Sequence, residues 1–432
     1  MTSAAPVSNR LLRNSAALVS ARAGSLLVSV SVLPYLVRYL TPSVYGAWAT
    51  IASTTALLSF ADLGMGRSLV NPLASALTHD DRCQVRRLVS TNIAILATSG
   101  SSFFLLLLSG VLFLPWRDFL SLTASDDGSL FTSIALVQGA LFAMTLALST
   151  GTYVRLAQHR SGRAAVITAL GSIIAAAGTL TAISAESSLL MITSFAAAGP
   201  MVGQALVTID LILSDPLFRP NLHLLERRLA LTFLGSGVLF SIQTLSGALA
   251  FTADTVVVGN ALGPTAVTQY TINGRAPLAL VSLIQAGIIP LWPIIHRRHA
   301  DGAGIGAFLA KAIVLFSLPA LCGAVAFYFG ANVVITYLGA GMVGLDRSLV
   351  IALCAWIVIS TAGAILGHAL VGVGRIGLQA TIAASMAITN VLLSALLVRR
   401  LGISGVMWAT VISYTLVVFP ASMRGLRRRQ KA

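Results

Sequence analysis

Runs of about 20 predominantly apolar residues recur along this sequence from one end to the other. A run of that length is what an α-helix needs to cross the hydrocarbon core of a bilayer. Backbone polar groups inside lipid must be paired within the structure, and these runs are too long to be the strands of a membrane barrel. We therefore predict an all-α integral membrane protein with about 12 transmembrane helices. The predicted spans are 14–37, 44–63, 89–114, 129–152, 164–184, 187–209, 231–253, 268–293, 307–329, 348–370, 377–397 and 402–423.

The distribution of basic residues gives the orientation. Of the 28 lysines and arginines, 20 lie in the two terminal tails and the even-numbered connections, and five lie in the odd-numbered connections. Cytoplasmic connections carry the excess of positive charge, so both termini are predicted to be cytoplasmic. The net charge of +15 is dispersed over short segments without interleaved aromatic residues. This pattern favours contact with anionic lipid headgroups over nucleic acid.

A short motif occurs twice. The sequence reads LTPSVYGAW at 40–48 and LGPTAVTQY at 262–270, 222 residues later in a chain of 432. This offset superposes the first predicted span on the seventh and the second on the eighth. Six helices in each half give both halves the same orientation, so a pseudo-two-fold axis would run along the membrane normal. We predict an N-terminal lobe at 1–213, a cytoplasmic linker at 214–230 and a C-terminal lobe with a basic tail at 231–432.

Polar residues inside two of the spans form stripes. Arg22, Ser25 and Ser29 share one face of the first span, and Thr271 and Arg275 share one face of the eighth. Either Arg22 extends back to the cytoplasmic headgroups, or it faces a polar cavity. Two arginines on polar stripes, one in each half of the chain, would make that cavity basic, and a planar guanidinium is well matched to phosphate oxygens.

Polar residues also occur in the seventh span and at the end of the second. Gln243 lies in the span 231–253 and Asp254 directly follows it, on the same face of the predicted helix. Asp254 is a candidate for a proton or cation site, but it could equally pair with Arg275 or lie among the outer headgroups. Asp62 is a candidate for coupling or gating, and its alternatives are pairing with Arg67 or capping a turn.

The sequence lacks the motifs of several kinds of catalytic chemistry. There is no GxxxxGK[ST] loop, nucleophile elbow, HExxH pair or paired-carboxylate arrangement. The three cysteines are far apart in the sequence and indicate neither a disulfide framework nor a metal site. We predict a transport protein that is not an enzyme and needs no cofactor or metal.

Three segments resemble a known family. The segment RYLTPSVYGAWATIASTTALLSFADLGMGRSLV at 38–70 is similar to the start of the polysaccharide flippases, whose superfamily also contains the multidrug and toxin extruders. The family pattern has a leucine-proline turn, a tyrosine-glycine pair and DLG. Here these are Leu40 with Pro42, Tyr45 with Gly46, and Asp62-Leu63-Gly64. The segments 251–275 and 401–413 resemble the second-half counterpart and the start of the last helix.

The resemblance implies a function. A polysaccharide flippase moves a polyprenyl-diphosphate-linked oligosaccharide from the cytoplasmic to the outer leaflet of the bacterial inner membrane by alternating access. The glycan serves O-antigen, capsule or exopolysaccharide synthesis, so glycan polymerase and export proteins are expected partners beside membrane lipids. Arg22 and Arg275 fit a cavity that receives the diphosphate.

Two alternatives stay open. A drug or cation antiporter of the same superfamily would favour an acidic cavity. A membrane-embedded glycan polymerase or ligase would need a catalytic outer loop, for which only the short connections 115–128 and 330–347 are available.

Overall fold

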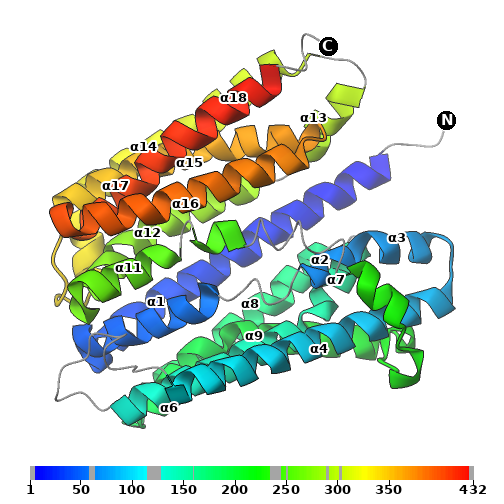
Figure 1. The fold of residues 1–432 in the computed structure, drawn as a ribbon, viewed down its shortest axis with the longest axis horizontal. Helices are drawn as coiled ribbons and strands as arrows, with labels where there is room; N and C mark the ends of the chain where they lie inside the picture. The colour runs from blue at the N-terminus through cyan, green and yellow to red at the C-terminus, as the bar shows by residue number, and fades with distance from the viewer. Residues whose placement is uncertain are drawn as a thin grey trace. The chain divides into compact units, whose positions relative to one another are not determined.

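The computed structural model describes residues 5–57, 64–113, 128–158, 160–233, 245–249, 252–288, 291–300 and 304–427. These residues form helices joined by short turns, and the helices fall into two compact units (Figure 1). One helix, α1 (Ala5–Leu57), contributes to both, because Met1–Val32 belong to the first unit and Leu33–Leu57 to the second. The predicted boundary placed all of α1 in the N-terminal lobe, so the two divisions differ at residues 33–57.

Helix α1 contains the first predicted span and residues 44–57 of the second, whose last residues, 58–63, lie outside the described part of the chain. Its backbone is helical except at Thr41, where φ is 63° and ψ is 158°. Pro42 follows directly, and proline both lacks an amide hydrogen and disfavours a helical conformation in the residue before it. The break therefore falls within the turn that the LTPSVYGAW motif predicts.

The first unit holds the helices between residues 58 and 244. Its core is formed by apolar side chains of α3, α4, α7 and α9, among them Leu73, Leu88, Val154 and Leu211, which are all buried. Helices α8 and α9 pack with their backbones close together at two glycines. A Cβ on Gly171 would lie 2.3 Å from the Gly203 nitrogen. The elements are α2 (Met65–Ser68), α3 (Val70–Thr78), α4 (Arg82–Phe113), α6 (Gly128–Leu148), α7 (Thr150–Ala157), α8 (Ser161–Ser184), α9 (Leu189–Ser214), η2 (Pro216–Phe218) and η3 (Leu222–Leu224).

The predicted linker 214–230 is attached to the first unit. The amides of Asn221 and Glu226 donate to the hydroxyls of Ser90 and Thr91 at 3.0 and 3.2 Å. Arg87 also lies 3.8 Å from the Glu226 carboxylate. All three partners are on α4, so the linker follows this helix as far as Glu226.

The second unit holds Leu33–Leu57 and Leu245–Ala432. Helix α15 is its most buried long helix, with 61% of its most apolar stretch covered by protein. The elements after α1 are α11 (Ala253–Leu262), α12 (Pro264–Ile288), α13 (Leu291–Ala300), α14 (Gly306–Leu338), α15 (Arg347–Gly372), α16 (Ile376–Leu401), α17 (Ile403–Ser413), the π-helical turn η4 (Tyr414–Val418) and α18 (Phe419–Arg427).

The two copies of the repeated motif touch each other inside this unit. The Thr268 hydroxyl donates to the Pro42 carbonyl at 2.5 Å. Gly46 packs so closely on Pro264 that a Cβ on Gly46 would lie 1.7 Å from the Pro264 oxygen. Position 42 corresponds to 264 in the repeat and 46 corresponds to 268, so the same two motif positions meet in both directions, by a hydrogen bond in one and by close packing in the other. A reciprocal contact of this kind is what a local two-fold axis generates.

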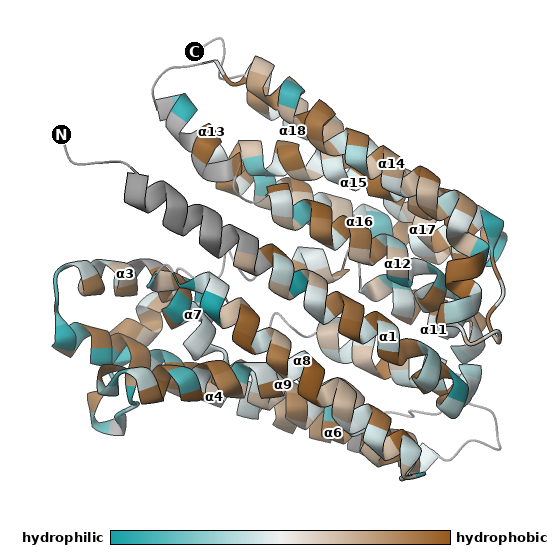
Figure 2. Ribbon diagram, turned by 180° about the vertical axis from the view of Figure 1, so that it is seen from behind, coloured by the Kyte–Doolittle hydropathy of each residue, from teal (hydrophilic) through white to brown (hydrophobic). Residues whose placement is uncertain are grey.

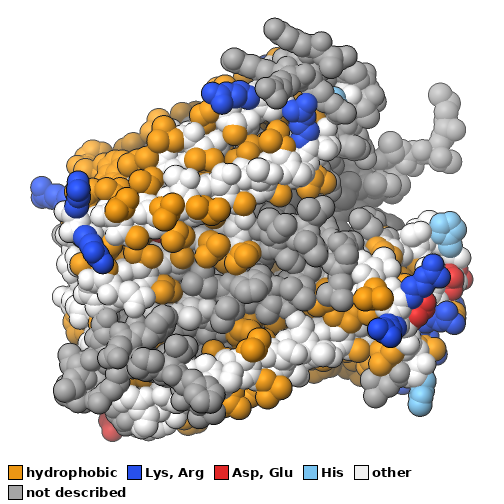
Figure 3. Space-filling view, in the orientation of Figure 1, with side chains coloured by type: hydrophobic (Ala, Val, Ile, Leu, Met, Phe, Trp, Pro, Cys, Tyr) orange, Lys and Arg blue, Asp and Glu red, His pale blue; other side chains and the backbone are white. Residues whose placement is uncertain are grey.

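Helix lengths and hydropathy agree with a membrane protein. Among the described residues, ten helices are long and apolar enough to cross a bilayer. The break at Thr41 divides the longest, and α12 adds a less apolar helix of 25 residues where the eighth span is predicted. Apolar residues dominate the middle of the helices in each unit (Figure 2). On the face in Figure 3, lysines and arginines lie at helix ends. The predicted all-α, multi-span fold is confirmed.

Candidate functional site

The predicted stripe around Arg22 is present on α1. Arg22 lies in the segment of α1 that belongs to the first unit, and its side chain is exposed, whereas Ser25 and Ser29 are half-buried. Residues three, four and seven positions apart share a helix face. The three side chains therefore form one polar stripe, as predicted from their spacing.

Thr271 and Arg275 lie one turn apart on α12 in the second unit. The Thr271 hydroxyl donates to the Val267 carbonyl at 2.8 Å and shares a hydrogen bond with the Tyr45 hydroxyl. The Arg275 side chain is exposed, and its guanidinium lies within electrostatic range of the same tyrosine. The tyrosine of the repeated motif thus joins this pair of predicted site residues.

The predicted substrate residues are divided between the two units. Arg22, Ser25 and Ser29 belong to the first, and Thr271 and Arg275 belong to the second. A basic cavity common to both arginines stays a prediction. Gln243 and Asp62 lie outside the described residues.

Asp254, at the start of α11, is the predicted coupling residue that the structure describes most fully. Its side chain is 2% exposed and is surrounded by four neutral groups. Thr410 and Tyr270 donate to Oδ2 at 3.0 and 3.3 Å, and Asn390 and Ser394 lie 3.2 and 3.3 Å from Oδ1. The predicted alternative partner, Arg275, is not in this set.

The groups around Asp254 determine how well its negative charge is stabilised. A buried carboxylate is costly unless hydrogen bonds or an opposite charge stabilise it. Three hydroxyls and one amide from α12, α16 and α17 stabilise the charge in part, and none of the ion pairs found in the described part of the chain includes Asp254. The group is therefore suited to exchange a proton or to take a small cation. Among the described residues, no three His, Cys, Asp or Glu side chains gather into a metal site.

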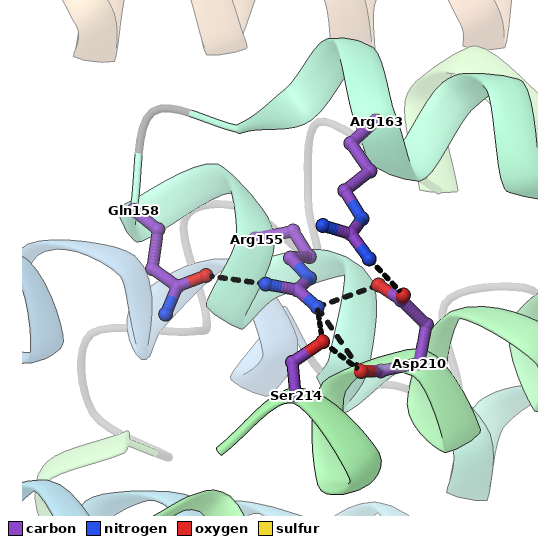
Figure 4. Close-up of polar contacts among 5 residues, drawn as sticks. All are labelled: Arg155, Gln158, Arg163, Asp210 and Ser214. Atoms are coloured by element: carbon purple, nitrogen blue, oxygen red, sulfur yellow. Dashed lines mark hydrogen bonds and ion pairs between the residues drawn. The ribbon is translucent and has the colours of Figure 1, made fainter.

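A charged cluster in the first unit was not predicted from the sequence. Arg155 on α7 is 1% exposed and donates to the Asp210 carboxylate of α9 at 2.5 Å, to the Asp210 carbonyl at 3.2 Å and to Ser214 at 3.1 Å. Arg163 of α8 holds the other carboxylate oxygen, and Gln158 accepts from Arg155 at 3.1 Å (Figure 4). One carboxylate thus ties together three helices.

The reason that this cluster was missed is local. By spacing, Arg155 and Arg163 belong to a short basic connection, and Asp210 is a single acid near a helix end. In the structure α7 continues to Ala157 and buries Arg155. Asp210 lies 55 residues further along the chain, so no periodicity relates the two.

The first unit also contains a cavity of about 590 Å³ that the sequence did not predict. Hydroxyl groups line one wall along α4, and the segment Leu225–Ala230 forms the other. Its lining residues are Met65, Thr91, Ala94, Ile95, Thr98, Ser99, Ser102, Leu225, Glu226, Arg227 and Ala230. Most of the accessible wall is apolar, so the cavity would suit a hydrocarbon chain better than a sugar.

Solved transporter structures share the fold. The chain is similar to an inward-facing multidrug resistance MATE family transporter of the MOP superfamily, with 14% identity, a TM-score of 0.68 and coverage of 95% of this chain and 94% of that one. An outward-facing multidrug resistance MATE family transporter matches with 16% identity, a TM-score of 0.69 and coverage of 97% and 95%. Lipid II flippase MurJ in an inward closed conformation matches with 14% identity, a TM-score of 0.67 and coverage of 97% and 87%.

The family follows from the sequence itself. No curated protein matches the sequence significantly. The model of a family described as polysaccharide biosynthesis protein matches residues 11–297, about two thirds of the chain. This region includes the break in α1, the polar stripes and Asp254. The chain is therefore a multi-pass membrane protein that belongs to the polysaccharide biosynthesis protein family, and its all-helical fold is that of the solved MATE and MurJ structures.

Proposed function

We propose that this protein is a flippase for a polyprenyl-diphosphate-linked oligosaccharide. It moves its substrate from the cytoplasmic to the outer leaflet of the bacterial inner membrane by alternating access, with both termini in the cytoplasm. The product feeds the synthesis of a cell-surface polysaccharide, which is O-antigen, capsule or exopolysaccharide. Its partners are the lipid-linked glycan, membrane lipids and the polymerase and export proteins that take the glycan onward.

One observation carries the proposal, which is an exposed arginine on a polar stripe well inside a membrane-length helix. A charge at that depth is costly in lipid and is kept where it has a functional partner. Arg22 meets these conditions on α1, and Arg275 lies near the polar side chains of Thr271 and Tyr45 in the second unit. The family description supports a carbohydrate substrate, and the likeness to a lipid II flippase supports a lipid-linked one.

Each side chain has a proposed role. Arg22 and Arg275 bind the diphosphate, because guanidinium groups form short, charge-assisted hydrogen bonds with phosphate oxygens. Each such bond contributes about 1.5–3 kcal/mol. Ser25, Ser29, Gln243 and Thr271 complete the polar surface and contact the phosphate or the first sugars.

The coupling role is proposed for Asp254, with Asp62 as a gating residue. A change in the charge of Asp254 would alter hydrogen bonds to α12, α16 and α17 together. A single bound proton or cation would thus act on three helices. Since these partners are neutral, binding such a charge does not compete with an existing ion pair.

The antiporter of cationic drugs is the second candidate, and Asp254 is the residue that bears on it. A cavity for a drug-sized cation needs an acid on its wall, whereas the Asp254 carboxylate is 2% exposed and is enclosed by four side chains of neighbouring helices. Arg22 and Arg275, by contrast, are exposed. A glycan polymerase or ligase would change glycan length in a membrane assay without moving the lipid-linked substrate.

The experiment is complementation of a bacterial strain that lacks its own flippase, with cytoplasmic lipid-linked glycan as the readout. At matched membrane levels, Arg22→Ala should abolish export and Arg22→Lys should restore part of it. Arg38→Ala is the matched control, because Arg38 is an exposed arginine further along α1. Normal export by Arg22→Ala would make Arg22 a headgroup anchor and overturn the proposal.

A further inference from the structure

A pocket with two arginines in its wall lies in the second unit, apart from the residues discussed above. It has a volume of about 520 Å³ and is lined by Arg375, Leu378, Ala421, Arg424 and Gly425. These residues come from the turn before α16, from the first turn of α16 and from α18. The pocket therefore opens where the predicted spans end, at the depth of lipid headgroups.

Three sources of positive potential meet at this pocket. Arg375 is half-buried and donates from Nη1 to the Gly425 carbonyl at 2.9 Å, which fixes its guanidinium at the wall. Arg424 is exposed on the facing helix. The first turn of α16 has no side-chain cap, and Ile376 and Gly377 at its start are exposed. Uncapped amides at a helix N-terminus attract anions.

The pocket is also bordered by apolar surface. Ile376 and Met423 are 48% and 46% exposed beside the two arginines, and Leu416 is 67% exposed further along the chain towards the membrane interior. The negative group of a ligand with long hydrocarbon chains would contact the two arginines, and its chains would contact this apolar surface. Free phosphate would use only the arginines.

The sequence around α18 agrees with this assignment. The helix reads FPASMRGLR and the sequence after it is RRQKA, so five basic residues follow Ser422 within ten positions. Clusters of four to eight basic residues next to a membrane helix attract anionic lipid headgroups. The π-helical turn η4 directly precedes α18, and such turns occur frequently at functional sites.

We propose that this pocket binds the phosphodiester headgroup of an anionic phospholipid, with Arg375 and Arg424 on the phosphate and the acyl chains along α16 and α18. The lipid is a resident of the leaflet at this end of the helices and is not the transported substrate. With the proposed orientation of the chain, that leaflet is the cytoplasmic one.

The test is native mass spectrometry of the purified protein with phosphatidylglycerol, and with phosphatidylcholine as the neutral comparison. Arg424→Gln should weaken phosphatidylglycerol binding about tenfold, and Arg375→Gln combined with Arg424→Gln should remove one bound lipid. Phosphatidylcholine binding should not change. The matched control is Arg399→Gln with Arg400→Gln, which removes two arginines from the opposite end of α16.

The outcomes are distinct. Arg424 is exposed, so Arg424→Gln tests binding even if loss of the Arg375 contact unfolds the pocket. Equal loss in the control variant would mean diffuse attraction and would overturn the site. Displacement of the lipid by millimolar inorganic phosphate would overturn its assignment to a lipid. Since the Arg22 complementation does not involve this pocket, either proposal can fail while the other holds.

Discussion

Thr41 and Gly263, 222 residues apart, adopt the same unusual backbone conformation. Their φ and ψ angles are 63° and 158° at Thr41, and 84° and 177° at Gly263. Both residues follow a leucine and precede a proline, at the junction of two helices. This region of the backbone map is essentially restricted to glycine. The first copy of the motif therefore contains a strained threonine where the second contains glycine.

We predict that Thr41→Gly raises the stability of the folded protein. A non-glycine residue in such a conformation costs about 1–3 kcal/mol, and the exposed Thr41 side chain has little packing to lose. The thermal unfolding midpoint of the purified protein measures the effect. Thr336→Gly, at an exposed helical position on α14, is the control and should lower that midpoint slightly. A drop for Thr41→Gly would contradict the strain.

The close contact at Gly46 gives a second prediction. Gly46→Ala would place a methyl group 1.7 Å from the Pro264 oxygen and 2.9 Å from the Thr268 hydroxyl. The two helices would have to separate, which should cost at least about 1–3 kcal/mol of unfolding free energy. Gly24→Ala is the matched control on the same helix, because a Cβ there meets nothing within 4 Å. Equal midpoints for the two variants would show that the helices do not pack this closely.

A third prediction concerns Asp254. Asp254→Asn should fold, because the hydroxyls of Tyr270 and Thr410 can reverse their roles and accept from the new amide. It should nevertheless lose export driven by an ion gradient, since asparagine cannot take up a charge. Asp254→Leu leaves buried donors unpaired and should also lose about 1–3 kcal/mol of stability.

The Asp254 variants are compared with Asp346→Asn. Asp346 caps α15 through the Leu349 amide at 2.9 Å, and asparagine caps helices about equally well. This control should export normally. If Asp254→Asn exports as well as the control at every imposed gradient, Asp254 has only a structural role.

The fourth prediction ranks the arginines that share Asp210. Arg155→Ala should cost about 3–5 kcal/mol, because it removes a buried partner and leaves the carboxylate poorly compensated. Arg163 is 52% exposed, and Arg163→Ala should cost less than about 1 kcal/mol. Arg155→Lys should not retain the stability of the unchanged protein, since an ammonium group cannot make the hydrogen bonds that the guanidinium makes to Asp210, Ser214 and Gln158 together. Denaturant midpoints of the three variants give the order.

Features set by local physics were predictable from the sequence. Hydrocarbon thickness fixes span length, so the membrane helices follow from apolar runs alone. The break at Thr41 follows from the proline after it, and the stripe of Arg22, Ser25 and Ser29 follows from helical periodicity. Each of these depends on residues fewer than about 25 positions apart.

Features set by distant contacts were not predictable. The partners of Asp254 on α16 and α17 lie 136 to 156 residues away. Arg155 was grouped with loop charges because nothing near it in the sequence indicates burial. The pocket at Arg375 and Arg424 likewise forms where α18 returns to the start of α16, 50 residues later.

The reciprocal contact between Pro42 and Thr268, and between Gly46 and Pro264, makes the motif complementary to its own repeat. An interface in which each surface meets its own equivalent is the kind formed by two identical molecules. A half-length chain that carries this motif would therefore present to a second copy of itself the surface through which the two motifs meet here.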